Sequence, residues 1–169
     1  MDLAFVMENP IRSAALHAES LCPEAVHLVV SPEHRFAERR AVLPADLERE
    51  TVLVTEAGCS YRVQFQHQLN TAGVQPAAML EFNSIEAIKQ SAMIGMGVGV
   101  LPAVATAAEV SQRKLVILPW RGKPISMVTQ AIRHKQKWVS PALKAFLDVV
   151  KDGFAKSNAK TSGNRRQPR

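Results

Sequence analysis

The sequence of 169 residues is poor in aromatic side chains, which make up 5% of it. A core must therefore be built from aliphatic residues, and a hydrophobic content of 47% is enough for one. No apolar run approaches the ~18 residues that span a bilayer, so we expect no membrane partner. The sequence does not start with a basic segment followed by an apolar one, which argues against secretion and favours the cytoplasm.

Cysteine is equally scarce. The two cysteines, Cys22 and Cys59, are far apart, and no C-x-x-C pair or His/Cys cluster accompanies them. We therefore expect no metal and no cofactor. Two cysteines without a secretory signal are typical of a reducing compartment.

Positive charge is concentrated at one end of the chain. Of the net charge of +6, residues 155–169 carry +5 without a single acid, which leaves the rest of the chain at +1. This end is also rich in Ser, Asn, Gly and Pro, so we predict a disordered basic tail over residues 155–169. The rest of the chain lacks the concentrated basic composition of a nucleic-acid reader.

Strand-like and helix-like segments alternate along the chain. Apolar or β-branched runs predict strands over residues 2–7, 24–31, 51–55, 77–82, 98–101, 115–118 and 125–132. Apolar residues at helical spacing predict helices over residues 60–72, 84–94, 103–109 and 141–154. Ser140 fits the N-cap of the last helix, with Pro141 at its first position. This alternation predicts an α/β fold with a mostly parallel sheet covered by helices.

Two predicted helices begin directly after predicted strands, and ligands bind at such points in α/β sheets. Free backbone N–H groups and the helix dipole there favour a carboxylate or a phosphate. The candidate ligand-binding residues are Gly58, Cys59, Ser60, Tyr61, Asn83 and Ser84. For the second helix we predict Asn83 as the N-cap with Glu86 as its reciprocal acid. An alternative of equal weight is that Asn83 or Ser84 only caps this helix.

The first of these segments has two further interpretations. Arg62 could supply charge to an acidic ligand, but we expect it to face solvent. The run Gly58-Cys59-Ser60-Tyr61-Arg62 is similar to a nucleophile elbow, although its closing glycine is missing. A small α/β hydrolase that uses Ser60 or Cys59 is therefore an alternative. Our main prediction is that the protein is not an enzyme.

Several phrases of the chain match one known family in their order along the sequence. They are Asp2-Leu3-Ala4-Phe5, Pro32-Glu33-His34-Arg35-Phe36-Ala37, Thr55 to Arg62, Ser84 to Gln90 with the following Gly97-Val98-Gly99-Val100-Leu101-Pro102, and Lys137 to Ala142. Together they resemble the effector-binding domain of LysR-type transcriptional regulators over residues 2–154. The resemblance implies a fold similar to periplasmic binding proteins.

On this resemblance, residues 1–154 form one domain that contains a complete Rossmann-like lobe plus remnants of a second lobe. The complete lobe covers about residues 20–112, and the remnants cover residues 2–10 and 114–154. The family's DNA-binding segment is absent, so the resemblance implies contact with DNA only through a missing N-terminal domain. It also implies a small-molecule effector and a homo-oligomer, either a dimer or a tetramer.

The resemblance further implies an effector site in the cleft between lobes, to which Val6 and Met7 would add a wall. Some relatives have an arginine near this point that grips an acidic effector, and Met7 in its place weakens the case for a dicarboxylate. Cys59 occupies a position similar to the reactive cysteine of peroxide-sensing members, but no resolving cysteine follows it, so we expect an ordinary thiol. A free-standing solute-binding protein is the other alternative, disfavoured by the missing signal peptide.

Overall fold

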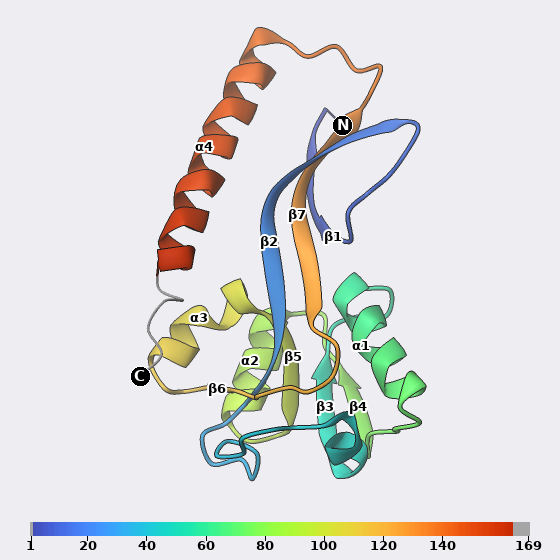
Figure 1. Cartoon of the computed structure of the whole chain (residues 1–169), viewed down its shortest axis with the longest axis vertical. Coiled ribbons are helices and arrows are strands. Elements are labelled where there is room, and N and C mark those ends of the chain that lie inside the picture. The colour runs from blue at the N-terminus through green and yellow to red at the C-terminus, as the bar shows by residue number, and fades with distance from the viewer. Residues whose placement is uncertain (1, 164–169) are drawn as a thin grey trace. The chain divides into compact units, whose positions relative to one another are not determined.

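The computed structural model describes the backbone of residues 2–163 and the side chains of residues 2–156. By their internal contacts the residues divide into two compact units (Figure 1). Unit 1 comprises Met1–Pro23 and Met127–Arg169, and unit 2 comprises Glu24–Ser126. Unit 2 is thus inserted into the sequence of unit 1. The chain passes between the units within strand β2 (Leu16–Val30) and within strand β7 (Ile125–His134).

Unit 2 is built around three parallel strands. They are β3 (Thr51–Val54), β4 (Ala78–Glu81) and β5 (Val98–Pro102), with β3 in the middle. Helix α1 (Ser60–Thr71) connects β3 to β4, and helix α2 (Ile85–Met93) carries the chain back to β5. Parallel strands need such crossover helices, and these three strands are the ones that have them. Their alternation with helices was predicted from the sequence.

The pairings β1–β7, β2–β5 and β2–β6 are antiparallel, so the prediction of a mostly parallel sheet was wrong. β2 pairs antiparallel with β5, and the short strand β6 (Val116–Ile117) pairs antiparallel with β2. A 3-10 helix η1 (Pro44–Arg49) and helix α3 (Ala103–Ser111) complete unit 2.

The core of unit 2 is aliphatic, as the composition predicted. Helix α2 packs Ile88 and Ala92 against one side of the strands, in a buried cluster that also contains Val29, Leu53, Leu101 and Leu115. Figure 1 places α1 on the opposite side, and its Phe65 and Leu69 are also buried. Both faces of the strands are therefore covered, which explains why their sequences are apolar at consecutive positions.

Unit 1 contains strand β1 (Ala4–Glu8), the outer parts of β2 and β7, and helix α4 (Pro141–Gly163). β1 pairs antiparallel with β7, with Ala4 opposite Ile132. The predicted cap of the last helix is confirmed, because the Ser140 hydroxyl accepts a hydrogen bond from the Leu143 N–H at 3.1 Å.

Three boundaries differ from the sequence predictions. β2 begins at Leu16 rather than at residue 24. α4 continues to Gly163, so residues 155–163 are helical where a disordered tail was predicted, because alanine and lysine favour helix there and no proline interrupts them. The rest of that tail, residues 164–169, lies outside the described residues. Finally, residues 114–126 group with unit 2 rather than with unit 1. Within the described part of the chain, no helix is long and apolar enough to cross a membrane.

Candidate functional site

The two predicted ligand-binding segments of unit 2 lie at the same edge of its sheet. β3 and β4 are parallel neighbours, and the Phe82 N–H just after β4 donates to the Val54 carbonyl at the end of β3, at 2.9 Å. Both helices start beyond this edge. The structure therefore brings together the six predicted residues of unit 2, which are Gly58, Cys59, Ser60, Tyr61, Asn83 and Ser84. Val6 and Met7 belong to β1 of unit 1.

The N-terminus of α1 is left open by its own side chains. Gly58 has a φ of +92°, which favours glycine and turns the chain from the strand into the helix. Cys59 follows as an extended N-cap residue whose side chain makes no capping hydrogen bond, and the first turn contains no acid. The N-cap side chain and the acids of the first turn, which usually offset the partial positive charge of a helix start, are thus not used here.

At the N-terminus of α2, by contrast, side chains offset the free N–H groups and the partial positive charge of the helix. The Ser84 hydroxyl accepts a hydrogen bond from the Ala87 N–H at 3.4 Å, and Glu86 lies in the first turn. Hydrogen bonds from Lys89 and Gln90 lower the pKa of the Glu86 carboxyl, which keeps a negative charge beside the helix end. The prediction of Asn83 as the N-cap was wrong, because Ser84 immediately precedes the first helical residue and has the extended backbone that a cap requires.

Arg62 connects the start of α1 to the ends of β3 and β4. The prediction that it faces solvent was wrong, because its side chain is only 12% exposed. Its Nη1 atom donates to the Thr55 carbonyl beyond β3 and to the Glu81 carboxylate at the end of β4, at 2.6 Å for the latter. Helix α1 turns this side chain over the strand ends, where Glu81 neutralises it. The guanidinium therefore positions the edge of the sheet and adds little net charge to it.

Two buried hydroxyls lie beneath the start of α1. Tyr61 is 3% exposed and Thr55 is 5% exposed, and neither hydroxyl has a hydrogen-bond partner among the described residues. Burial raises the pKa of Tyr61 to about 12. Sequence reasoning missed Thr55 and Glu81 as parts of this arrangement. Their signal was their position, since each stands at the carboxyl end of a strand.

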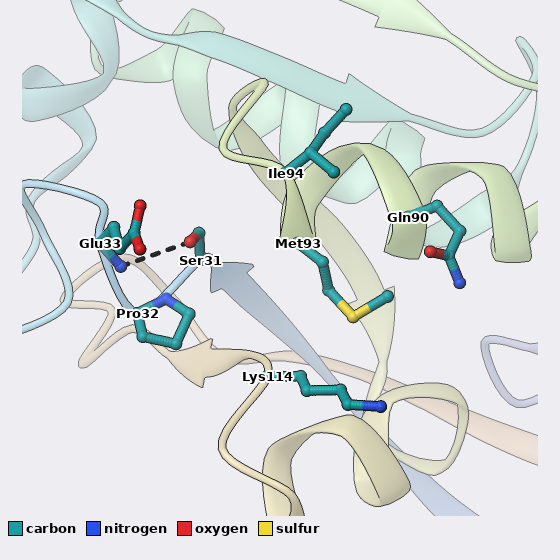
Figure 2. Close-up of a pocket in the computed structure, with 7 residues that line it drawn as sticks. All are labelled: Ser31, Pro32, Glu33, Gln90, Met93, Ile94 and Lys114. Atoms are coloured by element: carbon teal, nitrogen blue, oxygen red, sulfur yellow. Dashed lines mark hydrogen bonds between the residues drawn. The ribbon is translucent and has the colours of Figure 1, made fainter.

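A cavity of unit 2 lies away from these segments. It has a volume of about 520 Å³ and is formed by the residues after β2, by the C-terminal end of α2 and by Lys114 (Figure 2). Because β2 runs antiparallel to β5, this cavity lies at the sheet edge opposite the helix N-termini. It contains none of the predicted site residues. Across the described residues, no group of three or more His, Cys, Asp or Glu side chains could hold a metal ion.

The sequence of the chain is similar to those of several bacterial transcriptional regulators. The chain is 38% identical over 154 residues to the transcriptional regulator YwqM of Bacillus subtilis, a match that covers 91% of this chain and 52% of the relative. It is 37% identical over 140 residues to the regulator CbbR of Xanthobacter flavus, covering 80% of this chain and 42% of the relative. The chain thus spans about half the length of the curated relatives it matches.

A solved structure shows the same fold. The regulatory domain of CcmR from Synechocystis PCC6803, in complex with 2-PG, has a TM-score of 0.80 at 25% identity and is matched over 90% of this chain and 73% of that chain. The mixed sheet and its covering helices are therefore those of LysR regulatory domains, which have a periplasmic-binding-protein-like fold. The family model described as the LysR substrate binding domain matches residues 1–155. The chain belongs to the LysR substrate-binding domain family.

Proposed function

We propose that this chain is the effector-sensing part of a LysR-type transcriptional regulator and that it binds a small anionic metabolite at the N-terminus of α1. The observation that carries the proposal is the contrast between the two helix starts. Ser84 and Glu86 compensate α2, whereas α1 has neither a capping side chain nor an acid in its first turn. An anion bound there would satisfy the N–H groups and the dipole of α1. The CcmR domain binds 2-PG, which supports a small-molecule effector.

The proposed residues divide by role. Gly58 and Cys59 expose the backbone at the start of α1, and the Ser60 hydroxyl lies at its first position. Tyr61, Thr55 and the Arg62–Glu81 ion pair hold this backbone in place from beneath. Asn83 and Ser84 form the adjoining wall at the end of β4. The ligand-binding role of Val6 and Met7, which lie in β1 of unit 1, stays a prediction from the family resemblance.

The wider proposal follows the family. The relatives named above are transcriptional regulators, so we place this protein among sensors and not among enzymes, as a cytoplasmic homo-oligomer of two or four copies. We assign operator recognition to a region that corresponds to the part of each relative's sequence outside the match. Self-association is supported by the open outer edge of β1 within the described residues, beside the half-exposed side chains of Phe5 and Phe146. Sedimentation of a clean monomer at high concentration would contradict it.

A charge substitution at the first helical position tests the anion site. The intact chain should bind 2-PG, or another small carboxylate or phosphate from a panel, with a rise in its thermal midpoint that saturates with ligand concentration. Ser60→Glu places a fixed carboxylate in the first turn of α1, as Glu86 does in the first turn of α2. It should stabilise the free protein and abolish the ligand-induced rise.

The matched control is Ser60→Gln, which has nearly the same size without the charge. Ser60→Gln should retain most of the ligand response, because the helix dipole is not compensated. Equal loss of the response in both variants would show that the site needs the serine itself or the space around it. The absence of a response to every acid in the panel would contradict an anion site at α1.

A further inference from the structure

The turn that follows β7 in unit 1 gathers cations from two distant parts of the chain. The Lys135 N–H donates to the Ala15 carbonyl at 2.8 Å, and the Lys135 ammonium donates to the Ser13 carbonyl at 3.0 Å. These bonds fix Ser13 and Ala15 beside Lys135, and Arg12 directly precedes Ser13. Arg12 is thereby placed with the run Arg133-His134-Lys135-Gln136-Lys137. We call Arg12, Arg133, Lys135 and Lys137 the basic surface.

Three of the four charges of the basic surface are not neutralised. Lys137 forms an ion pair with Asp2, and this partner holds the pKa of the Asp2 carboxyl below its usual value. Arg12, Arg133 and Lys135 form no ion pair within the described residues. Glu19, another acid of unit 1, forms an ion pair with Lys151. Like charges held close together repel one another, so packing alone does not explain this arrangement.

An exposed tryptophan adjoins the same surface. Trp138 follows Lys137 directly and is 75% exposed, although tryptophan is among the most strongly apolar side chains. Its indole N–H is a donor, and it has no acceptor among the described residues. Uncompensated cations with an amphipathic donor beside them suit a polyanion whose oxygens accept hydrogen bonds.

We propose that the basic surface binds the phosphate backbone of DNA without reading its sequence. About half to two-thirds of all protein–DNA hydrogen bonds go to phosphate and sugar oxygens, and Arg and Lys are suitable donors. DNA is the favoured polyanion because the chain belongs to a family of transcriptional regulators. This contact goes beyond effector sensing. It also departs from the sequence-based prediction that DNA is contacted only through a domain outside this chain. It would add affinity and positioning to operator recognition elsewhere in the regulator.

Salt dependence of duplex binding by the full chain is the decisive measurement. Each phosphate contact contributes about 0.9 to the slope of log K against log salt concentration, so neutralising three cations should lower the slope by about 2.7. The test variant combines Arg12→Gln, Arg133→Gln and Lys135→Gln. The matched control combines Arg40→Gln, Arg49→Gln and Lys123→Gln, three exposed cations of unit 2. Both variants retain the basic C-terminal residues, whose contribution therefore cancels.

The expected result is a lower slope and weaker duplex binding for the test variant alone. In a Trp120→Phe background, which leaves Trp138 as the sole indole, duplex binding should also change the tryptophan fluorescence. Equal losses in the two triple variants, or no binding to duplex by the parent chain, would overturn the proposal. So would binding of polyglutamate in preference to duplex through the same three residues, which would assign the surface to an acidic protein. Thermal midpoints of both variants confirm that they fold.

Discussion

The guanidinium of Arg62 and the carboxylate of Glu81 form an ion pair of 2.6 Å that joins the first turn of α1 to the end of β4. The same nitrogen also donates to the Thr55 carbonyl. Two neighbouring strand ends and one helix start are thus held together by a single side chain. This explains how an edge made of short loops can present a defined backbone to a ligand.

We predict that Arg62→Met lowers the free energy of unfolding by about 1–3 kcal/mol, because it leaves the Thr55 carbonyl without its partner. Glu81→Gln should cost less, about 0–1 kcal/mol, because Glu81 is 46% exposed and its amide oxygen can still accept. Urea denaturation measures both. Arg49→Met, at an exposed arginine, is the control. A loss no larger in Arg62→Met than in this control would show that the bridge contributes nothing.

The single tyrosine of the chain offers a clean test of burial at the α1 start. The pKa of Tyr61 is raised from 10.0 to about 12, so the folded state retains its proton where the unfolded state has lost it. Between about pH 10 and 12 the unfolded state therefore binds fewer protons, and stability falls as the pH rises. Tyrosinate absorbance should titrate near pH 12 in the native protein. A native midpoint near 10 would contradict the buried hydroxyl, and Tyr61→Phe should lose this part of the pH dependence.

The two residues before α2 are predicted to differ in their effect. Ser84→Ala removes the hydroxyl that accepts from Ala87 and should cost about 1 kcal/mol. Asn83→Ala alters an exposed residue that does not cap the helix, so its effect should stay within about 0.5 kcal/mol. Thermal or urea unfolding compares them directly. The opposite order would restore Asn83 as the cap.

Two glycines are predicted to respond to alanine in opposite directions. At Gly97 a Cβ atom would lie 2.3 Å from the Thr51 carbonyl oxygen, which is backbone and cannot move aside. Gly97→Ala should therefore cost about 3 kcal/mol or more, or prevent folding. Gly153 lies in α4 with nothing within 4 Å of its Cβ position, so Gly153→Ala should stabilise by about 0.5–1 kcal/mol. Soluble yield and unfolding midpoints report both, and a tolerated Gly97→Ala would mean that β5 can shift.

The sequence was most informative where local pattern and burial coincide. The segments β3, α1, β4, α2 and β5 alternate in a way that local periodicity reveals, and both helix starts were recognised from their position after strands. β2 was predicted only from residue 24, because Glu19 and Pro23 interrupt the apolar pattern of its first half. Its antiparallel direction depends on pairing with β5, some seventy residues later, which no local pattern encodes.

The candidate site could be located from the sequence but not resolved in detail. The orientation of Arg62 depends on Glu81, which is 19 residues away and belongs to another strand. Likewise the basic surface requires Arg12 and Lys135 to be neighbours, although the bond that places them joins residues 122 positions apart. From composition alone, residues 1–154 carry a net charge of only +1. That sum does not reveal the local excess of positive charge at the basic surface.

The insertion of one unit into the other sets an order on biosynthesis. Residues 24–126 emerge from the ribosome as one contiguous stretch and can complete their own contacts early. β1 has been made long before, yet its partner β7 is among the last strands to appear. Throughout that interval the apolar stretch from Ala4 to Met7 lacks its neighbour and is open to non-native contacts.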